Sequence, residues 1–142
     1  MSSKRLPTLE DWNARGAENL PGLLGIVFLK VEPSEVVARL EVRKALMAPN
    51  GYLHAGTVVT LADTCCGFGT VASLPDGATG FTTIELKSNF LGSARDGAIV
   101  CVAKPLHLGR TTQVWDATVT PEGADKAIAQ FRCTQMVLWP KG

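Results

Sequence analysis

The sequence predicts an α+β domain in which one antiparallel sheet curls around a single enclosed helix. The stretch from about 55 to 74, AGTVVTLADTCCGFGTVASL, is too long for one strand, and its apolar residues cover almost the whole circumference of a helix. Two stretches with strand character precede this helix and four follow it. Because the central helix and the strands are segregated along the chain, we expect an α+β arrangement.

The length and charge of the chain argue against several classes of protein. At 142 residues it can bury one sizeable core, so we place no domain boundary within 1–142. Lys and Arg number 14 against 13 Asp and Glu, which argues against binding to nucleic acid or to an anionic membrane surface. The start lacks the apolar stretch of a signal peptide, and no run approaches the roughly 18 apolar residues of a membrane-spanning helix. We expect a cytoplasmic protein.

The cysteines do not indicate a metal or redox site. Cys65, Cys66, Cys101 and Cys133 form no C-x-x-C pair. In a reducing compartment such residues are most simply buried small hydrophobes. We see no cluster of metal ligands and expect no metal and no cofactor.

The N-terminal segment, 1–20, is expected to be helical in its second half. Thr8 is followed three residues later by Asp11, which is typical of a capping box at a helix start. Pro21 and Gly22 are expected to stop this helix.

Six stretches have strand character. In 35–45, the apolar residues at 36, 38, 40 and 42 alternate with a second set that includes two arginines and a glutamate, so this stretch and 23–31 predict a hairpin with one solvated face. The other expected strands are 80–91, 98–109, 110–120 and 126–139.

The central helix carries one narrow polar stripe, made of Thr60, Asp63, Thr64 and Gly67 at helical spacing. A buried ionised carboxylate is costly unless something pairs with it or uses it. Asp63 therefore either locks a subunit interface as a paired carboxylate or belongs to a functional site. Gly67 and Gly69 would permit the close approach of another backbone.

His54 stands where the central helix should begin, followed by Ala55 and Gly56. The first backbone N–H groups of a helix have no intrahelical partner, and the dipole favours negative charge, so this turn could bind an oxyanion. A lone His here is also compatible with a structural role. The nine residues from His54 to Asp63 span about 13 Å along a helix, too far for one bond-making event. Two antiparallel copies related by a two-fold axis would bring the Asp of one copy to the helix start of the other.

The stretch NGYLHAGTVVTLADT resembles the Asn-Gly-x-x-His-Gly-Gly signature, with an acidic residue nine positions after the His, of hotdog-fold acyl-CoA thioesterases. The branch is the one that contains phenylacetyl-CoA and 4-hydroxybenzoyl-CoA thioesterases. NFLGSARDG is similar to that family's strand-ending Tyr/Phe-Leu-x-Pro-Ala-x-x-Gly, and the resemblance covers roughly 20–139. It implies a hotdog fold, hydrolysis of an aryl or medium-chain acyl-CoA to free acid and CoA, and a homodimer as the minimum active unit within a homotetramer.

The resemblance also implies roles for individual residues. Asp63 matches the carboxylate that attacks the thioester carbonyl or activates a water to do so. The backbone N–H of Ala55 would polarise the thioester oxygen, and His54 would help to position the thioester. Thr83 falls where relatives place a Ser or Thr that holds the nucleophilic water, with Thr82 as the alternative one residue away.

Further residues are candidates for substrate binding. Gly56 lies in the same first turn as Ala55, and Gly109 and Arg110 lie at a turn that in such thioesterases often contacts the CoA phosphates. An ordinary solvated turn arginine is the alternative. Asn50 is either a site residue or a turn residue.

Two departures from the family's pattern stand out. Ala55 replaces the usual glycine after the His, so it can donate its N–H to an oxyanion only if its φ stays negative, as a non-glycine residue prefers. Ala48 stands where relatives often place an amide side chain, six residues before the His.

Two other functions compete with thioester hydrolysis. A hotdog hydratase or dehydratase would need an Asp-x-x-x-x-His pair, and Phe68 stands five residues after Asp63. A non-catalytic protein that binds an acyl ligand would keep the pocket without needing Asp63.

Overall fold

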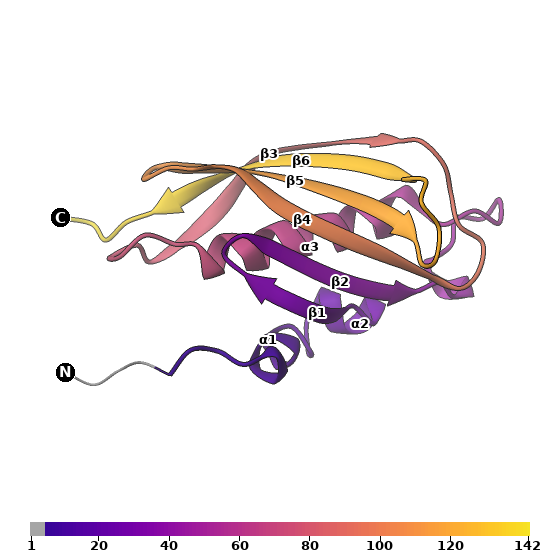
Figure 1. Ribbon diagram of the computed structural model, residues 1–142, viewed down its shortest axis with the longest axis horizontal. Coiled ribbons are helices and arrows are strands. Elements are labelled where there is room, and N and C mark those ends of the chain that lie inside the picture. Colours follow the sequence, from indigo (N-terminus) through magenta and orange to yellow (C-terminus); the bar gives the residue numbers. More distant parts are fainter. Residues whose placement is uncertain (1–4) are drawn as a thin grey trace.

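The computed structural model describes residues 5–142 and has the expected α+β architecture. The six strands form one antiparallel sheet in the order β1-β2-β4-β5-β6-β3, and the long helix α3 packs against all six (Figure 1). The elements are α1 (Leu9–Arg15), α2 (Leu20–Leu24), β1 (Val27–Glu32), β2 (Glu35–Glu41), the 3-10 turn η1 (Lys44–Leu46), α3 (Ala55–Ala72), β3 (Gly80–Phe90), β4 (Ala98–Leu108), β5 (Thr112–Pro121) and β6 (Ala129–Leu138).

The N-terminal helix begins as predicted but ends earlier. Thr8 and Asp11 form both hydrogen bonds of the capping box. The helix then ends at Arg15 with Gly16 as its C-cap, whereas Pro21 and Gly22 lie inside a second short helix, α2. Proline needs no hydrogen-bond acceptor in a first helical turn, so Pro21 starts α2 and does not stop α1.

The strands alternate as the sequence predicts. In β2 the residues at 36, 38 and 40 are fully buried, and in β6 those at 129, 131, 133 and 135 face the same way. The inner faces of these strands and α3 enclose the core, which includes all four cysteines as free thiols. Burial raises the pKa of the Cys65 thiol well above its ordinary value, in agreement with a packing role.

The helix α3 is the core of the molecule. By length and composition alone its 18 residues could cross a membrane, contrary to the expectation that no segment would. Its contacts with every strand and with α2 show that it is instead the enclosed core helix of a globular protein. It ends at the C-cap Ser73, before the turn that contains Pro75 and Gly77.

The two glycines of α3 face aromatic rings of the same chain. A Cβ on Gly69 would come within 2.4 Å of the Trp115 ring, and one on Gly67 would come within 3.2 Å of the Phe81 ring. The prediction that these glycines admit another backbone is therefore wrong. They admit two aromatic side chains from the surrounding sheet.

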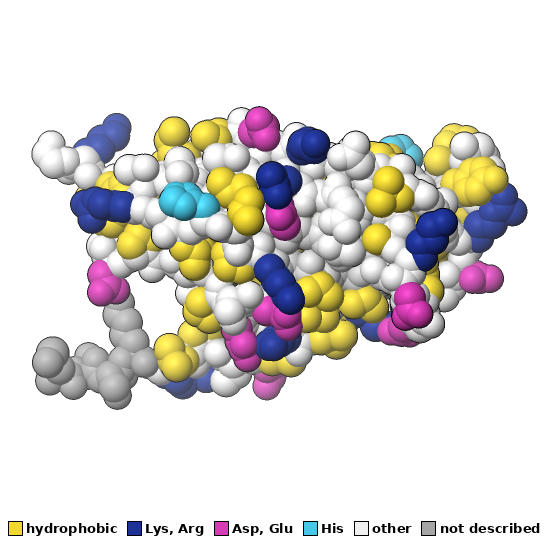
Figure 2. Space-filling view, turned by 45° about the horizontal axis from the view of Figure 1, so that its top comes forward, with side chains coloured by type: hydrophobic (Ala, Val, Ile, Leu, Met, Phe, Trp, Pro, Cys, Tyr) yellow, Lys and Arg dark blue, Asp and Glu magenta, His cyan; other side chains and the backbone are white. Residues whose placement is uncertain are grey.

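The outer face of the sheet carries charges of both signs. Figure 2 shows Lys and Arg side chains interspersed with Asp, Glu and apolar side chains over this face. Ion pairs such as that between Arg132 and Asp116 cross neighbouring strands there.

Candidate active site

His54 caps the start of α3. Its backbone is extended, and its Nδ1 accepts a hydrogen bond of 2.7 Å from the N–H of Gly56. Because Nδ1 is an acceptor, the ring proton lies on Nε2, which is left free as a donor. The structure thus places His54 at the helix start, as the sequence predicts.

The N–H of Ala55 is the one left for a ligand in this first turn. The Gly56 N–H is taken by His54, and the Thr57 N–H donates to the His54 carbonyl at 3.0 Å. Within residues 5–142 the Ala55 N–H has no acceptor. Ala55 keeps a negative φ, so its side chain causes no strain. An exposed N–H at the positive end of a helix is suited to an anionic oxygen.

Asn50 takes part in the turn before α3. Its Oδ1 accepts a hydrogen bond of 3.2 Å from the N–H of Tyr52, and Gly51 adopts a φ of 86°. This is an Asx-type turn, which favours the structural alternative for Asn50. Position 48 is an alanine, so no amide or other polar side chain extends from it toward the start of α3.

Asp63 lies halfway along α3 and is partly buried. Its Oδ1 is inaccessible to solvent and has no hydrogen-bond partner among the described residues. Burial raises the pKa of Asp63 above its ordinary value. No cation compensates the charge of Asp63 within residues 5–142.

Thr83 lies on the same side of the sheet as Asp63. A seven-residue connection joins α3 to β3, and the two elements run in opposite directions (Figure 1). The ring of Phe81, two residues before Thr83 on β3, reaches Gly67 on α3. Thr82, the alternative one residue away, pairs with the exposed Met136 on the outer face of the sheet.

Sequence reasoning missed Gln135, which lies opposite Thr83 on β6. The Thr83 hydroxyl donates a hydrogen bond of 2.6 Å to Gln135 Oε1. Gln135 is fully buried, and its Nε2 has no hydrogen-bond partner in the described part of the chain. One feature of the sequence could have identified Gln135: it is polar, whereas the other inward-facing residues of β6 are apolar.

Gly109 and Arg110 lie far from the helix start of their own chain. They form the turn between β4 and β5, where the Gly109 N–H donates to the Thr112 carbonyl. This turn lies near the C-terminal end of α3, because Gln113 Nε2 donates to the Ser73 carbonyl. The guanidinium of Arg110 stacks 4.1 Å above the ring of Trp139.

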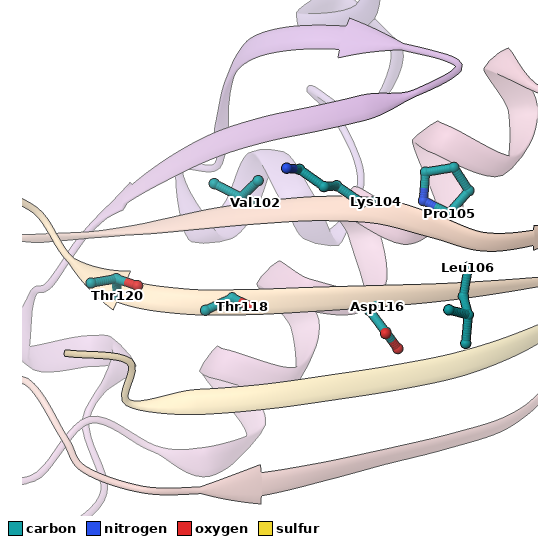
Figure 3. A pocket seen from close by; sticks show the side chains of 7 residues that line it. All are labelled: Val102, Lys104, Pro105, Leu106, Asp116, Thr118 and Thr120. Carbon is teal, nitrogen blue, oxygen red and sulfur yellow. The ribbon is translucent and has the colours of Figure 1, made fainter. Parts of the chain in front are cut away.

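Two surface cavities differ in their relation to this site. One, of about 480 Å³, lies on the outer face between β4 and β5, away from α3 (Figure 3). The other, of about 530 Å³, adjoins the loop before α3 and is bordered by the cations Arg43, Lys44 and Arg95 and by Ala48. The sequence alone did not predict this basic cavity.

Comparison with known proteins agrees with the fold and the site. The family model of the thioesterase superfamily matches residues 50–128. The 1,4-dihydroxy-2-naphthoyl-CoA hydrolase of Listeria monocytogenes is 34% identical over 78% of this chain and 89% of its own length. The Escherichia coli enzyme of the same name is 36% identical over 84% of this chain and 87% of its own. The crystal structure of a mutant thioesterase from Pseudomonas aeruginosa superposes with a TM-score of 0.88 at 30% identity, over 95% of this chain and 96% of that one.

These similarities extend over the whole sheet and the central helix, and they include the segment with His54 and Asp63. The chain therefore belongs to the thioesterase superfamily and is a hotdog-fold enzyme of the acyl-CoA hydrolase kind.

Proposed function

We propose that this chain, as one domain over 1–142, hydrolyses the thioester of an aromatic acyl-CoA to the free acid and CoA, with Asp63 as nucleophile or general base. The observation that carries the proposal is the Asp63 carboxylate, whose Oδ1 is buried and unpartnered on the polar stripe of an otherwise apolar helix. Such an arrangement costs folding free energy, and a reaction that uses the carboxylate would explain why it is there.

The residue types suit thioester hydrolysis. Attack on the thioester carbonyl forms a tetrahedral oxyanion, which the free N–H of Ala55 can stabilise together with the dipole of α3. The His54 Nε2–H is a second donor at this helix start. A carboxylate on the opposite side of the carbonyl serves as nucleophile or takes the proton of an attacking water.

One subunit does not bring these groups together. His54 and Asp63 are nine residues apart on one straight helix, which is about 13 Å along its axis. We therefore propose a homodimer in which Asp63 of one copy faces Ala55 of the other, with two such dimers forming a tetramer. Isologous pairing repeats the contact and creates two sites.

The exposed edge of the sheet supports this dimer. The strand β3 is eleven residues long and pairs with β6 on one side alone within residues 5–142. Leu86 and Phe90 point to the inner face of the sheet, yet each is almost half exposed. A long apolar edge strand is a template for pairing with another chain.

The relatives favour an aromatic acyl group over a medium-chain aliphatic one. Two of them are named as hydrolases of 1,4-dihydroxy-2-naphthoyl-CoA, a bicyclic aromatic thioester. We place the CoA phosphates at Arg110, whose guanidinium is exposed, and the enzyme in the cytoplasm, with no nucleic-acid or membrane partner.

The test is a thiol-release assay on a panel of aryl and aliphatic acyl-CoAs with wild-type protein, Asp63→Ala and Asp63→Asn. We expect turnover by the wild type, fastest with aryl substrates, and a loss of at least about a hundredfold in both variants, because a positioned base contributes that much or more. The control is Asp76→Ala, in the exposed turn after α3, which should keep wild-type rates. Wild-type rates in a folded Asp63→Ala protein would refute the role of Asp63. Stoichiometric acyl-CoA binding without turnover by the wild type would favour a binding protein.

A further inference from the structure

The basic cavity beside the start of α3 concentrates positive charge in a chain that is otherwise almost neutral. Arg43, Lys44 and Arg95 border this space of about 530 Å³, and Asp96 is the one acidic residue of its lining in the described chain. None of the three cations forms an ion pair with a carboxylate among residues 5–142. A hollow with three uncompensated cations attracts an anionic ligand.

The two arginines of the cavity are held in place by contacts that leave most of their donors free. Arg43 Nη2 donates a hydrogen bond of 2.7 Å to the Leu23 carbonyl, and the Arg95 guanidinium lies 4.4 Å from the centre of the Tyr52 ring. A guanidinium has five N–H donors, of which the first contact uses one and stacking uses none. Lys44 adds an ammonium with three more donors. Such groups suit the oxygens of a phosphate.

Hydrogen bonds join the cavity to the candidate active site. Lys44 begins the turn η1, and Leu46 ends it. The Leu46 carbonyl accepts from the His54 N–H at 3.1 Å and from the Thr57 hydroxyl at 2.9 Å, so this turn is fixed to the first turn of α3. A ligand held by the cavity therefore lies beside the helix start at which the Ala55 N–H is free.

The rest of the lining suits a phosphate that belongs to a larger organic molecule. Apart from its charged residues, the cavity is lined mainly by apolar side chains, namely Val42, Met47, Ala48 and Pro49. Its volume also exceeds that of one phosphate group. CoA carries a diphosphate and a separate 3′-phosphate on a nucleotide, so the substrate of the proposed reaction has both features.

We propose that the basic cavity binds a phosphate group of the acyl-CoA substrate and thereby selects CoA thioesters over thioesters whose thiol arm carries no phosphate. This inference rests on the proposed function and adds a second phosphate site to that at Arg110. In the proposed dimer the two α3 helices are antiparallel. Arg110, which lies near the C-terminal end of α3 in one copy, therefore comes to the end of the pair at which the other copy has its helix start and its cavity.

The test compares two substrates with the same aryl acyl group in steady-state thiol release. One is the acyl-CoA, and the other is the acyl-pantetheine, which has the same thioester arm without phosphate. In the triple variant Arg43→Gln, Lys44→Gln, Arg95→Gln we expect KM for acyl-CoA to rise at least about tenfold with kcat changed less than about twofold. KM for acyl-pantetheine should change less than about twofold, whereas a structural disturbance would affect both substrates.

The matched control is Lys104→Gln, which removes one cation from the cavity on the outer face (Figure 3) and should leave both KM values unchanged. A triple variant that keeps the wild-type KM for acyl-CoA, or that raises KM equally for both substrates, would overturn the proposal. If loss of the contact between Arg43 and Leu23 prevents folding, the double variant Lys44→Gln, Arg95→Gln decides by the same criteria.

A third substrate, the acyl thioester of 3′-dephospho-CoA, identifies the phosphate that the cavity holds. If it holds the 3′-phosphate, the triple variant should leave KM for this substrate unchanged, and if it holds the diphosphate, KM should rise as it does for acyl-CoA. Either result supports the proposal.

Turnover by the wild type is measured first, because its absence with every substrate means that the proposed function has failed. Isothermal titration calorimetry with CoA itself then tests the cavity alone. We expect the wild type to bind CoA at least about tenfold more tightly than the triple variant does. Equal affinities, or no binding by the wild type, would overturn the proposal.

Discussion

The Asp63 carboxylate subjects this protein to opposing demands of folding and catalysis. One of its oxygens is buried without a hydrogen bond, and burial raises the pKa of Asp63 above its ordinary value of 3.8. A carboxyl group whose pKa is raised by folding binds its proton more tightly in the folded state. The free energy of unfolding therefore decreases as the pH rises from below 3.8 through the folded pKa.

Asp63→Asn should consequently stabilise the protein while it abolishes turnover. At pH 7 we expect Tm to rise by a few degrees, since the amide carries no charge to desolvate. The gain should shrink as the pH is lowered through the raised pKa of Asp63, because the wild-type carboxyl then becomes protonated. Thermal unfolding followed by circular dichroism at several pH values measures this. A Tm at pH 7 below that of the wild type would contradict an unpaired Asp63, and Asp76→Asn serves as the exposed control.

The sequence is informative about some of these residues and silent about others. His54 and Asp63 are found because their spacing on one helix is set by local structure and resembles a family signature. Gln135 escapes because its partner, Thr83, lies 52 residues away, and only the register of β3 against β6 shows the contact. The same register places Thr83 on the inner face of the sheet and Thr82 on the outer face, a difference that the sequence left open.

At the scale of elements, α3 depends on its glycines. Gly69 faces Trp115, which is fully buried, and an added Cβ would meet the indole ring at 2.4 Å. An alanine normally favours a helix over glycine by about 1 kcal/mol, but overpacking of a core costs about 1 to 3 kcal/mol. At Gly69 we expect the cost of overpacking to exceed the gain in helix propensity, so that alanine lowers the free energy of unfolding.

We therefore expect Gly69→Ala to lower Tm by several degrees in thermal unfolding. Gly67→Ala is the comparison within the same helix, because its Cβ would approach the far end of the Phe81 ring at 3.2 Å, and that side chain can yield. Its Tm should stay close to that of the wild type or rise. A higher Tm for Gly69→Ala than for Gly67→Ala would show that the packing of Trp115 against α3 leaves room for a Cβ at position 69.

The elements also show where sequence patterns succeed. The start of α3 is predicted to the residue, because a capping residue, a polar stripe and a continuous apolar surface agree there. The break between α1 and α2 is missed, because Pro21 can either end a helix or begin one and the chain on each side is too short for a clear period.

At the scale of the whole molecule, the inner side of β3 is partly uncovered within one copy of the chain. Leu86 lies opposite the buried Cys133, yet 44% of it is exposed because the sheet ends there. We expect the wild type to sediment as a dimer or tetramer and Leu86→Lys to sediment as a monomer, because a buried lysine without a partner is costly. This monomer should have lost thiol release, since the proposed site takes Ala55 and Asp63 from different copies.

Leu23→Lys is the control for the assembly, because Leu23 is also exposed but lies on α2, next to the opposite edge of the sheet. It should keep both the oligomeric state and the activity. An active monomer in either protein would contradict the shared site.

The β-bulge in β3 has a consequence for how this chain tolerates insertions and deletions. The residues Thr83 and Glu85 face two consecutive residues of β6, so Ile84 is an extra residue in the ladder. Removing Ile84 would leave every other pair in register, because the two strands would then match residue for residue. Among homologous chains, the loss of a single residue is thus readily accommodated at this bulge, beside Thr83.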